Sequence, residues 1–355
     1  MGHRIILTVI LLSFTICSFG DNIFNGAQWI SVSESQNTPN QWFCFRKQVE
    51  CERKHSIAEL NIAVDSKYWL WINDQLVIFE GGLKRGPSPS GTYYDPVDIA
   101  PYLTKGSNTI AILLWHFGKD GFSHINSGKA ALLFEAIAPG LEIVSDASWQ
   151  CALYEAYQNT EAPFPNYRMP ESNIRFDARQ AITNWNRTSF EGSLPGAVCV
   201  GKAGKAPFGD LVERPIPQWK NSGLLSYVSV RESLRGDTLF CRLPYNAQIT
   251  PYLKVEAEAG KTIHIRMDNY EGGSERNVRA EYITREGEQE YESYGWMNGH
   301  EVYYIIPEGV KVLDVKYRET GYNTDLAGSF HCDDPFYDEL WQRSARTLYI
   351  TMRDN

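Results

Sequence analysis

The chain has 355 residues, of which 43% are hydrophobic, and a chain of this size and composition can bury the cores of about two domains. Its formal net charge of −9 argues against nucleic acid and anionic membrane surfaces as partners, since both carry negative charge. No apolar stretch approaches the length of about 20 residues that a membrane-spanning helix needs, so we predict no membrane span.

Residues 1–20 have the pattern of an export signal peptide. A basic start with Arg4 precedes an apolar run over residues 5–16, and small residues follow at the position of a cleavage site. We expect the mature protein to begin at Asp21 and to be periplasmic or secreted. A lipid anchor on Cys17 is the alternative, which is disfavoured because the preceding residue is bulky and branched.

Residues 21–139 are predicted to form an N-terminal β-sandwich domain. Apolar and polar side chains alternate over residues 58–65, which is the pattern of a strand with one buried face. Residues 68–72 and 75–79 flank Asn73-Asp74, a dipeptide that tolerates the positive φ angles of a two-residue hairpin turn. Further strands are expected at 109–115 and 130–137. Many short strands without intervening helices favour a sandwich or jelly roll. Sandwiches of this kind resemble galactose-binding-like modules.

Residues 140–222 are predicted to be a linking region packed on the sandwiches, because prolines and glycines interrupt it throughout. Strands resume near Leu224, and residues 223–330 are predicted to form a second β-sandwich domain. Its expected strands are 262–267, 278–284, 301–306 and 313–317, with Arg285-Glu286-Gly287-Glu288 as a hairpin turn.

Residues 331–355 are predicted to contain one amphipathic helix. Asp333 or Asp334 can cap its N-terminus, and Pro335 suits its first turn. The apolar face of this helix is broad, and a face this broad normally packs between other helices. No second long helical pattern precedes it in the sequence. We therefore expect its partners to be encoded beyond Asn355, in a C-terminal catalytic domain missing from this chain. The broad apolar face comprises Phe336, Tyr337, Leu340, Trp341, Ala345, Leu348, Tyr349 and Met352.

Several short segments carry a family resemblance, strongest from about Tyr282 onward. In these segments the chain resembles the bacterial α-L-rhamnosidases of glycoside hydrolase family 78. The segments are Tyr317-Arg318-Glu319-Thr320-Gly321-Tyr322, Gly328-Ser329-Phe330, Cys332-Asp333-Asp334-Pro335, Leu340-Trp341, Arg346-Thr347-Leu348 and Met352-Arg353-Asp354-Asn355, with Trp115-His116-Phe117-Gly118, Phe176-Asp177-Ala178-Arg179 and Glu213-Arg214-Pro215-Ile216-Pro217 upstream.

The resemblance implies that the predicted helix is the first helix of an (α/α)6 catalytic barrel. It also implies hydrolysis with inversion, in which a carboxylic acid protonates the leaving oxygen and a carboxylate activates water. No residue of this chain matches either role, so no catalytic residue is predicted here.

Three groups of acidic residues were candidates for chemistry, and simpler roles explain them. Asp268, Glu271 and Glu275, like the glutamates of 286–292, lie in glycine-rich or hairpin segments where solvated loops are expected. The segment 331–334 has metal-ligand residue types, but adjacent residues cannot all face one ion, and helix capping explains its acids. We predict no metal site and no cofactor.

Aromatic and polar residues at strand ends and in loops are the candidates for carbohydrate binding. Flat rings stack on the apolar faces of sugars, while amides, acids and histidines pair with hydroxyls. Core packing is the alternative role for each of them. The candidates are Tyr93, Tyr94, Trp115, His116, Phe122, His124, Trp296, Asn298 and His300.

The cysteines after the export signal are predicted to be isolated buried thiols, because their spacing is scattered and no zinc-type pair occurs. A disulfide between Cys44 and Cys51 is the alternative. The cysteines are Cys44, Cys51, Cys151, Cys199, Cys241 and Cys332.

Together these patterns predict a mainly β chain of two sandwiches and one C-terminal helix. The expected function is that of an accessory, carbohydrate-presenting N-terminal region of an exported α-L-rhamnosidase-like glycoside hydrolase. Its partners would be a rhamnose-containing glycan or another polysaccharide and the missing catalytic domain. A stand-alone carbohydrate-binding protein without hydrolase activity, or a purely structural interaction module, are the alternatives.

Overall fold

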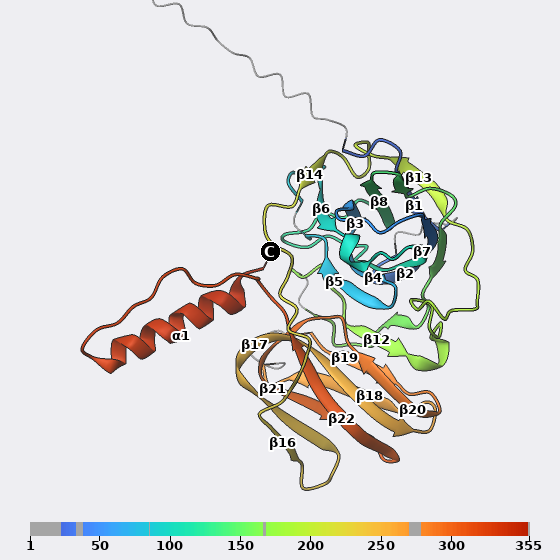
Figure 1. The fold of residues 1–355 in the computed structure, drawn as a ribbon. Helices are drawn as coiled ribbons and strands as arrows, with labels where there is room; N and C mark the ends of the chain where they lie inside the picture. Colours follow the sequence, from blue (N-terminus) through green and yellow to red (C-terminus); the bar gives the residue numbers. More distant parts are fainter. Residues whose placement is uncertain (1–22, 33–37, 85, 166–167, 270–277, 354–355) are drawn as a thin grey trace, which may run out of the picture.

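The computed structural model describes residues 23–32, 38–84, 86–165, 168–269 and 278–353. It confirms the mainly β prediction: the described residues form two β-sandwich bodies and one α-helix, which projects beside them (Figure 1). The predicted export signal lies outside the described residues. Among the residues that are described, no helix is both long and apolar enough to cross a membrane.

The first sandwich consists of two facing sheets. One follows the order β13-β1-β8-β3-β6-β14, with β9 paired to β8, and the other follows β10-β2-β7-β4-β5. Its elements are β1 (Gln28–Ser31), β2 (Gln41–Cys51), β3 (Glu59–Asp65), β4 (Lys67–Ile72), β5 (Gln75–Gly81), β6 (Thr92–Asp98), η1 (Ala100–Tyr102), β7 (Gly106–His116), β8 (Ala131–Ala138), β9 (Leu141–Val144), β10 (Gln150–Leu153), β13 (Val198–Lys202) and β14 (Leu211–Glu213).

The alternation along β3 places Leu60, Ile62 and Val64 in the core between the two sheets, as the pattern predicts. The predicted hairpin is also present, since β4 pairs with β5. Its turn residues Asn73 and Asp74 have φ angles of 48° and 69°, which suit a two-residue turn between twisted strands. The local sequence signals of this sandwich therefore agree with its pairing.

The second sandwich is built around one long strand, β17 (Thr238–Ala257). Its first half pairs with β16 and β21, whereas its second half pairs with β20 and β22. The register shifts between Arg242 and Ala247, so β17 takes part in both layers. The other elements are β11 (Tyr157–Asn159), β12 (Ile174–Asp177), η2 (Ala178–Gln180), β15 (Leu224–Ser226), β16 (Ser229–Glu232), β18 (Thr262–Met267), β19 (Ala280–Ile283), β20 (Gly287–Glu292), β21 (Met297–Ile305) and β22 (Val310–Glu319).

The predicted hairpin turn at Arg285–Glu288 is wrong, although a tight turn does occur there. β19 pairs with β12 and β18, while β20 pairs with β17, so the turn carries the chain between layers. Gln289 closes it, because its side chain accepts from the Arg285 amide at 2.7 Å and donates to the Arg285 and Gly287 carbonyls. Turn chemistry alone did not reveal the strand partners.

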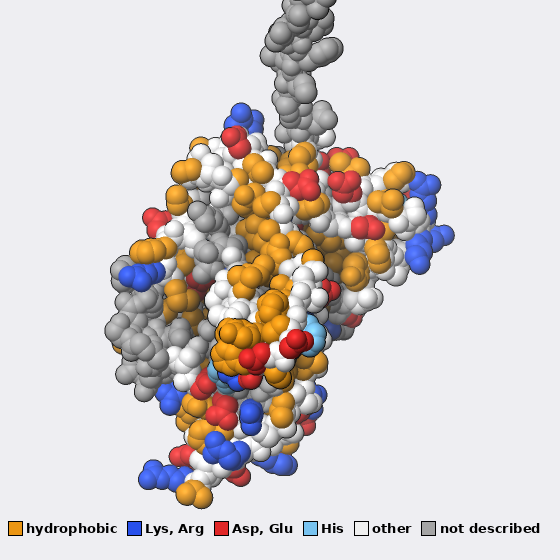
Figure 2. All heavy atoms as spheres, turned by 90° about the vertical axis from the view of Figure 1, so that its left-hand side faces the viewer, with side chains coloured by type: hydrophobic (Ala, Val, Ile, Leu, Met, Phe, Trp, Pro, Cys, Tyr) orange, Lys and Arg blue, Asp and Glu red, His pale blue; other side chains and the backbone are white. Residues whose placement is uncertain are grey.

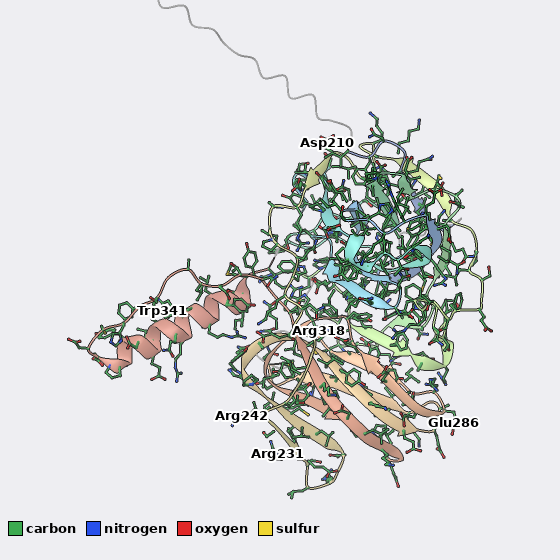
Figure 3. All side chains as sticks on the ribbon, in the orientation of Figure 1. Asp210, Arg231, Arg242, Glu286, Arg318 and Trp341 are labelled. Atoms are coloured by element: carbon green, nitrogen blue, oxygen red, sulfur yellow. The ribbon has the colours of Figure 1, made fainter. Side chains whose placement is uncertain are left out.

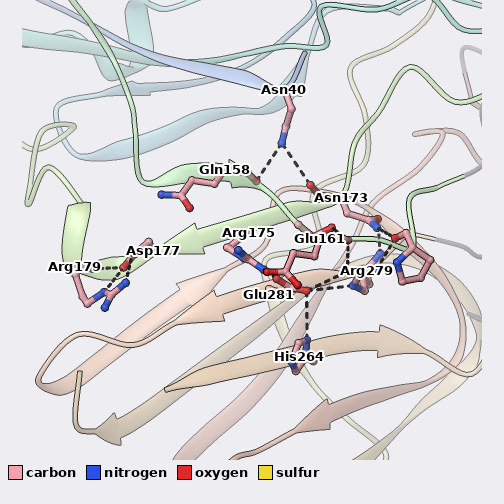
Figure 4. A network of polar contacts seen from close by, with 12 residues as sticks. Asn40, Gln158, Glu161, Asn173, Arg175, Asp177, Arg179, His264, Arg279 and Glu281 are labelled. Carbon is pink, nitrogen blue, oxygen red and sulfur yellow. Dashed lines mark hydrogen bonds and ion pairs between the residues drawn. The ribbon is translucent and has the colours of Figure 1, made fainter. Parts of the chain in front are cut away.

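Residues 140–222 supply strands to both sandwiches and carry the polar network that joins them (Figure 4). Asn40 lies just before β2, and its side-chain Nδ2 donates to the Gln158 carbonyl at 3.2 Å and to Asn159 Oδ1 at 3.0 Å. Asn173 in turn accepts from the Arg279 amide at 3.0 Å. This network links the first sandwich, through β11 and β12, to β19 of the second.

Glu281 is the charged centre of that network. It accepts from Arg175 Nε at 2.7 Å and Arg279 Nη2 at 3.2 Å, and His264 Nδ1 lies 3.5 Å away. Burial alone would raise the pKa of Glu281, but the hydrogen bonds of these three side chains and the charge of Arg175 outweigh it and lower the pKa to about 2. The carboxylate is therefore held ionised within the second sandwich.

The predicted C-terminal helix is α1 (Pro335–Thr351). Asp334 caps it by accepting from the Phe336 amide at 3.0 Å. The chain runs outward from the junction of the sandwiches, and α1 returns toward it (Figure 1). Near its C-terminal end, Arg346 donates to the Asn246 carbonyl and lies 3.8 Å from the centre of the Tyr245 ring.

Arg353, just beyond α1, anchors the helix in the junction. Its guanidinium lies between the rings of Trp219 and Trp296, at 4.7 and 4.6 Å. It pairs with the buried carboxylate of Glu80 in the first sandwich and donates to Gln248 in the second at 2.9 Å. The C-terminal end of α1 is thus attached to both sandwiches.

The rest of α1 has no fully buried residue, and its apolar face divides into two. Trp341, labelled in Figure 3, lines a groove together with Ala345, Tyr349 and the segment 323–326. Figure 2 shows hydrophobic side chains gathered on the face from which the helix projects. The outward side, which we call the α1 stripe, comprises Phe336, Tyr337, Leu340 and Leu348, each 47–62% exposed.

The described cysteines are all free thiols. The alternative disulfide between Cys44 and Cys51 is excluded, because both lie on β2 and an extended strand separates them by about 23 Å. The thiols are not uniformly buried as predicted, since Cys199 is exposed and Cys332 is half-buried.

Candidate functional site

A cleft opens at one end of the first sandwich, between the loops that follow β5 and β7. Two adjoining hollows share its lining residues, with Tyr93 in one and Phe122 in the other. We call it the loop cleft. The shared lining comprises Gly86, Pro89, Gly91, His124 and Ile125.

Asp65, at the end of β3, organises one wall of the loop cleft. Its carboxylate accepts from Ser66 Oγ at 2.6 Å and from the Ser127 amide at 3.0 Å. His116 Nδ1 lies 3.4 Å from Oδ1, and His124 Nε2 lies 3.9 Å from the same oxygen. Burial would raise the pKa of Asp65, but His116, His124 and the hydrogen bond with Ser127 hold it well below its usual range.

His124 presents an unused hydrogen-bonding atom beside the cleft. Its Nδ1 lies 2.8 Å from the Lys84 carbonyl, which can only accept, so Nδ1 carries a hydrogen. Within the described residues, Nε2 is buried and has no hydrogen-bond partner. A ligand hydroxyl, which can donate or accept, would satisfy it.

A buried ion pair fixes the loop behind His124. Lys84, which also lines the cleft, pairs with Glu171 at 2.8 Å, and both side chains are at most 6% exposed. The ring of Phe117 contacts His124 edge-on at a centroid distance of 5.2 Å. The imidazole is therefore held from two sides, which favours a pre-formed site.

The two neighbouring tyrosines of β6 have different surroundings. Tyr93 is half-buried in the loop cleft. Tyr94 faces the other way, as successive strand residues do. Its ring packs on Phe24 at 5.7 Å, and its hydroxyl donates to Glu213 at 3.4 Å. Tyr94 is therefore a core residue.

Trp115 and His116 are buried and take structural roles. The Trp115 ring stacks on Trp42 at 4.7 Å, and its Nε1 donates to Asn40 Oδ1 at 2.8 Å. His116 is fully buried and contacts Asp65, so it supports the cleft wall from behind. Neither side chain offers a surface to a ligand.

The remaining candidates belong to the second sandwich and do not join the loop cleft. Trp296 covers the guanidinium of Arg353. Asn298 is half-buried on β21, opposite Gln248 of β17. His300 is exposed, with Nδ1 3.5 Å from Asp268 Oδ2.

Sequence reasoning missed Asp65 and Ser127. Asp65 occupies the polar phase of the β3 alternation, where a solvent-facing residue is expected, yet it is only 7% exposed. Ser127 contributes its backbone amide, which no side-chain pattern reveals. The neighbouring loop residues Phe122 and His124 were the usable sequence signal for this cleft.

The acidic groups considered for catalysis have partners of their own. Glu288 pairs with Lys254 at 2.6 Å, and Glu292 pairs with Arg318 at 2.7 Å. Glu290 accepts from the Tyr252 hydroxyl at 2.7 Å. Glu271 and Glu275 lie outside the described residues. Across the described part of the chain, no three His, Cys, Asp or Glu residues converge as a metal site.

Comparison with known proteins gives matches at the level of structure only. No family model matches the sequence, and no curated protein does. A family 78 rhamnosidase of Bacillus sp. GL1 superposes with a TM-score of 0.82 over 94% of this chain, at 16% identity. The α-L-rhamnosidase of Dictyoglomus thermophilum gives 0.68 over 92%, at 19% identity. That of Streptomyces avermitilis, solved with L-rhamnose, gives 0.67 over 89%, at 16% identity.

The chain spans only part of each of these proteins, namely 59%, 39% and 32% of their lengths in the same order. At these identities the likeness concerns the fold. It extends over both sandwiches, because it covers nearly all of the present chain. As the resemblance in its sequence predicts, the chain has the fold of a portion of the family 78 α-L-rhamnosidases.

Proposed function

We propose that this chain is the carbohydrate-presenting region of an exported α-L-rhamnosidase-like glycoside hydrolase, and that the loop cleft holds the glycan. The observation that carries this proposal is His124, whose buried Nε2 has no hydrogen-bond partner in the described structure beside a cleft with an aromatic rim. The shared fold with α-L-rhamnosidases supports the enzyme class.

The chemistry of the loop cleft suits a neutral sugar. The Phe122 ring is 75% exposed, so one of its faces can stack on the apolar face of a pyranose. Hydroxyl and amide side chains line the same cleft and can exchange hydrogen bonds with sugar hydroxyls. They are Ser66, Ser90, Asn126 and Ser127.

Hydrolysis itself would belong to a helical domain that packs on the α1 stripe. Four large apolar side chains gather there with nearly half or more of their surface exposed, and burial of each would contribute about 1.5 to 3 kcal/mol. Arg346 and Arg353 attach the C-terminal end of α1 to the sandwiches. The cleft and the catalytic domain would then keep a fixed relative orientation.

The test is a binding titration with L-rhamnose and with a rhamnose-containing oligosaccharide, followed by calorimetry or NMR. His124→Ala should weaken binding about tenfold, because a buried hydrogen bond to the ligand is lost. Phe122→Ala should weaken it through the lost stacking surface. His300→Ala, which removes an exposed histidine from the second sandwich, should bind as the wild type does. Equal affinities for all four proteins, or no saturable binding to the wild type, would refute the cleft assignment.

A further inference from the structure

A second pocket lies on the outer face of the five-stranded sheet and shares no lining residue with the loop cleft. At its floor is Arg46 of β2, which pairs with Gln150 of β10 and Ala111 of β7. Arg46 is only 3% exposed. We call this cavity of about 300 Å³ the Arg46 pocket.

The guanidinium of Arg46 is buried, and no carboxylate of the described residues forms an ion pair with it. Its Nη1 donates to the carbonyls of Trp185 and Arg187 at 3.2 and 3.0 Å, and the Phe190 ring lies 5.4 Å away. Its Nη2 makes no hydrogen bond in the described structure. Burial lowers the pKa of Arg46, and the charge of Asp74 only partly opposes this. A buried positive charge without an anionic partner is stabilised when an anion binds next to it.

The walls of the pocket supply hydrogen-bond donors and no carboxylate. Lys47 Nζ contacts Ser148 Oγ and lies 3.9 Å from the partly exposed Asp146. In a chain of net charge −9, a pocket lined by two cations and no acid departs from the average surface. The lining comprises Arg46, Lys47, Gln48, Ser148, Gln150, Phe190 and Gly192.

We propose that the Arg46 pocket binds an oxyanion of the carboxylate or sulfate type, carried by an acidic sugar or free in solution. The planar guanidinium suits such groups, and the oxyanion would accept from Nη2 and Lys47. A purely structural role would require only Nη1, which holds the Trp185–Arg187 backbone. It would leave Nη2 without a hydrogen-bond partner in the described structure.

The experiment titrates sodium glucuronate, sodium sulfate and methyl glucoside into the full chain by calorimetry, with sodium chloride keeping the ionic strength constant. We expect saturable binding of at least one anion and none of the neutral sugar. Binding of glucuronate assigns the pocket to a sugar-borne anion, and binding of sulfate alone assigns it to a free one. Failure of both anions to bind the wild type overturns the proposal.

Three variants locate the binding. Lys47→Gln keeps both carbonyl contacts of Arg46 and should weaken the anion about fivefold. Arg46→Gln should weaken it about tenfold or more. Lys311→Gln removes an exposed lysine of the second sandwich and should bind as the wild type does. If Arg46→Gln fails to fold, Lys47→Gln decides alone, and unchanged affinity in Lys47→Gln contradicts the proposed site.

Discussion

The buried carboxylate of Glu281 should contribute strongly to the acid response of the protein. Its folded-state pKa of about 2 lies below the ordinary value of 4.5, so its ionised form stabilises the fold. That contribution is complete above about pH 4.5 and is lost as the pH falls toward 2. We expect the free energy of unfolding of the wild type to drop by about 3 kcal/mol more across this range than that of Glu281→Gln.

Urea denaturation at several pH values between 2.5 and 7 measures this difference. Glu191→Gln, which removes an exposed glutamate from the linking region, should retain the wild-type profile. Equal pH slopes for the wild type and Glu281→Gln would show that other acids dominate.

The residues of the loop cleft were predictable only in part. Phe122 and His124 lie in a loop rich in polar and aromatic side chains, so their types alone marked them as candidates. Asp65 could not be found this way. The strand pattern predicts which face of the sheet its side chain occupies. It does not predict that a loop distant in the sequence covers that face. For Trp115, the residue type was compatible with stacking on a sugar, yet its ring stacks on Trp42.

At the scale of elements, strands with clear alternation and the Asn73-Asp74 turn were predictable from local sequence. The Arg285–Glu288 turn was recognised as a turn but assigned to the wrong pairing. Its residues specify a reversal of the chain, whereas the partners of β19 and β20 depend on the path of β17 through two layers. Pairing between distant strands is set by tertiary packing, which a single local window does not contain.

The α1 stripe leads to a prediction about association. Its exposed apolar side chains form a surface of the kind that binds partners or hydrophobic dyes. We expect the full chain to bind such a dye and to self-associate with rising concentration. Leu340→Ser combined with Leu348→Ser should reduce both effects, with a small change in stability because neither side chain is buried. Dye fluorescence and light scattering provide the measurements.

The matched control substitutes apolar residues that are exposed elsewhere. Val228→Ser combined with Val230→Ser removes two exposed apolar side chains from the second sandwich and should leave dye binding and scattering unchanged. If the Leu340→Ser and Leu348→Ser double variant binds the dye and self-associates as strongly as the wild type, the α1 stripe is not the surface responsible.

The whole molecule is held together by an aromatic cluster between the sandwiches as well as by the network around Glu281. Trp42 and Trp69 lie on the outer face of the five-stranded sheet. Tyr157, from the linking region, stacks on Trp42 at 4.0 Å, and Tyr294 of the second sandwich stacks on Trp69 at 4.7 Å. The five-stranded sheet is thus buried on both faces. Its apolar content could be read from the sequence, but the identity of the second covering layer could not.

This cluster should make the two sandwiches unfold together. Removing the Tyr294 ring should cost about 3 kcal/mol and uncouple them, because the lost contacts lie between the units. Native-state hydrogen exchange can compare amides of β7 with amides of β21. We expect similar opening free energies in the wild type and separated ones in Tyr294→Ala. Tyr303→Ala removes a ring that packs on Phe240 within the second sandwich and should lower both values together. Separate opening in the wild type, or parallel loss in Tyr294→Ala, would mean that the cluster does not couple the units, and the polar network would then be the remaining link.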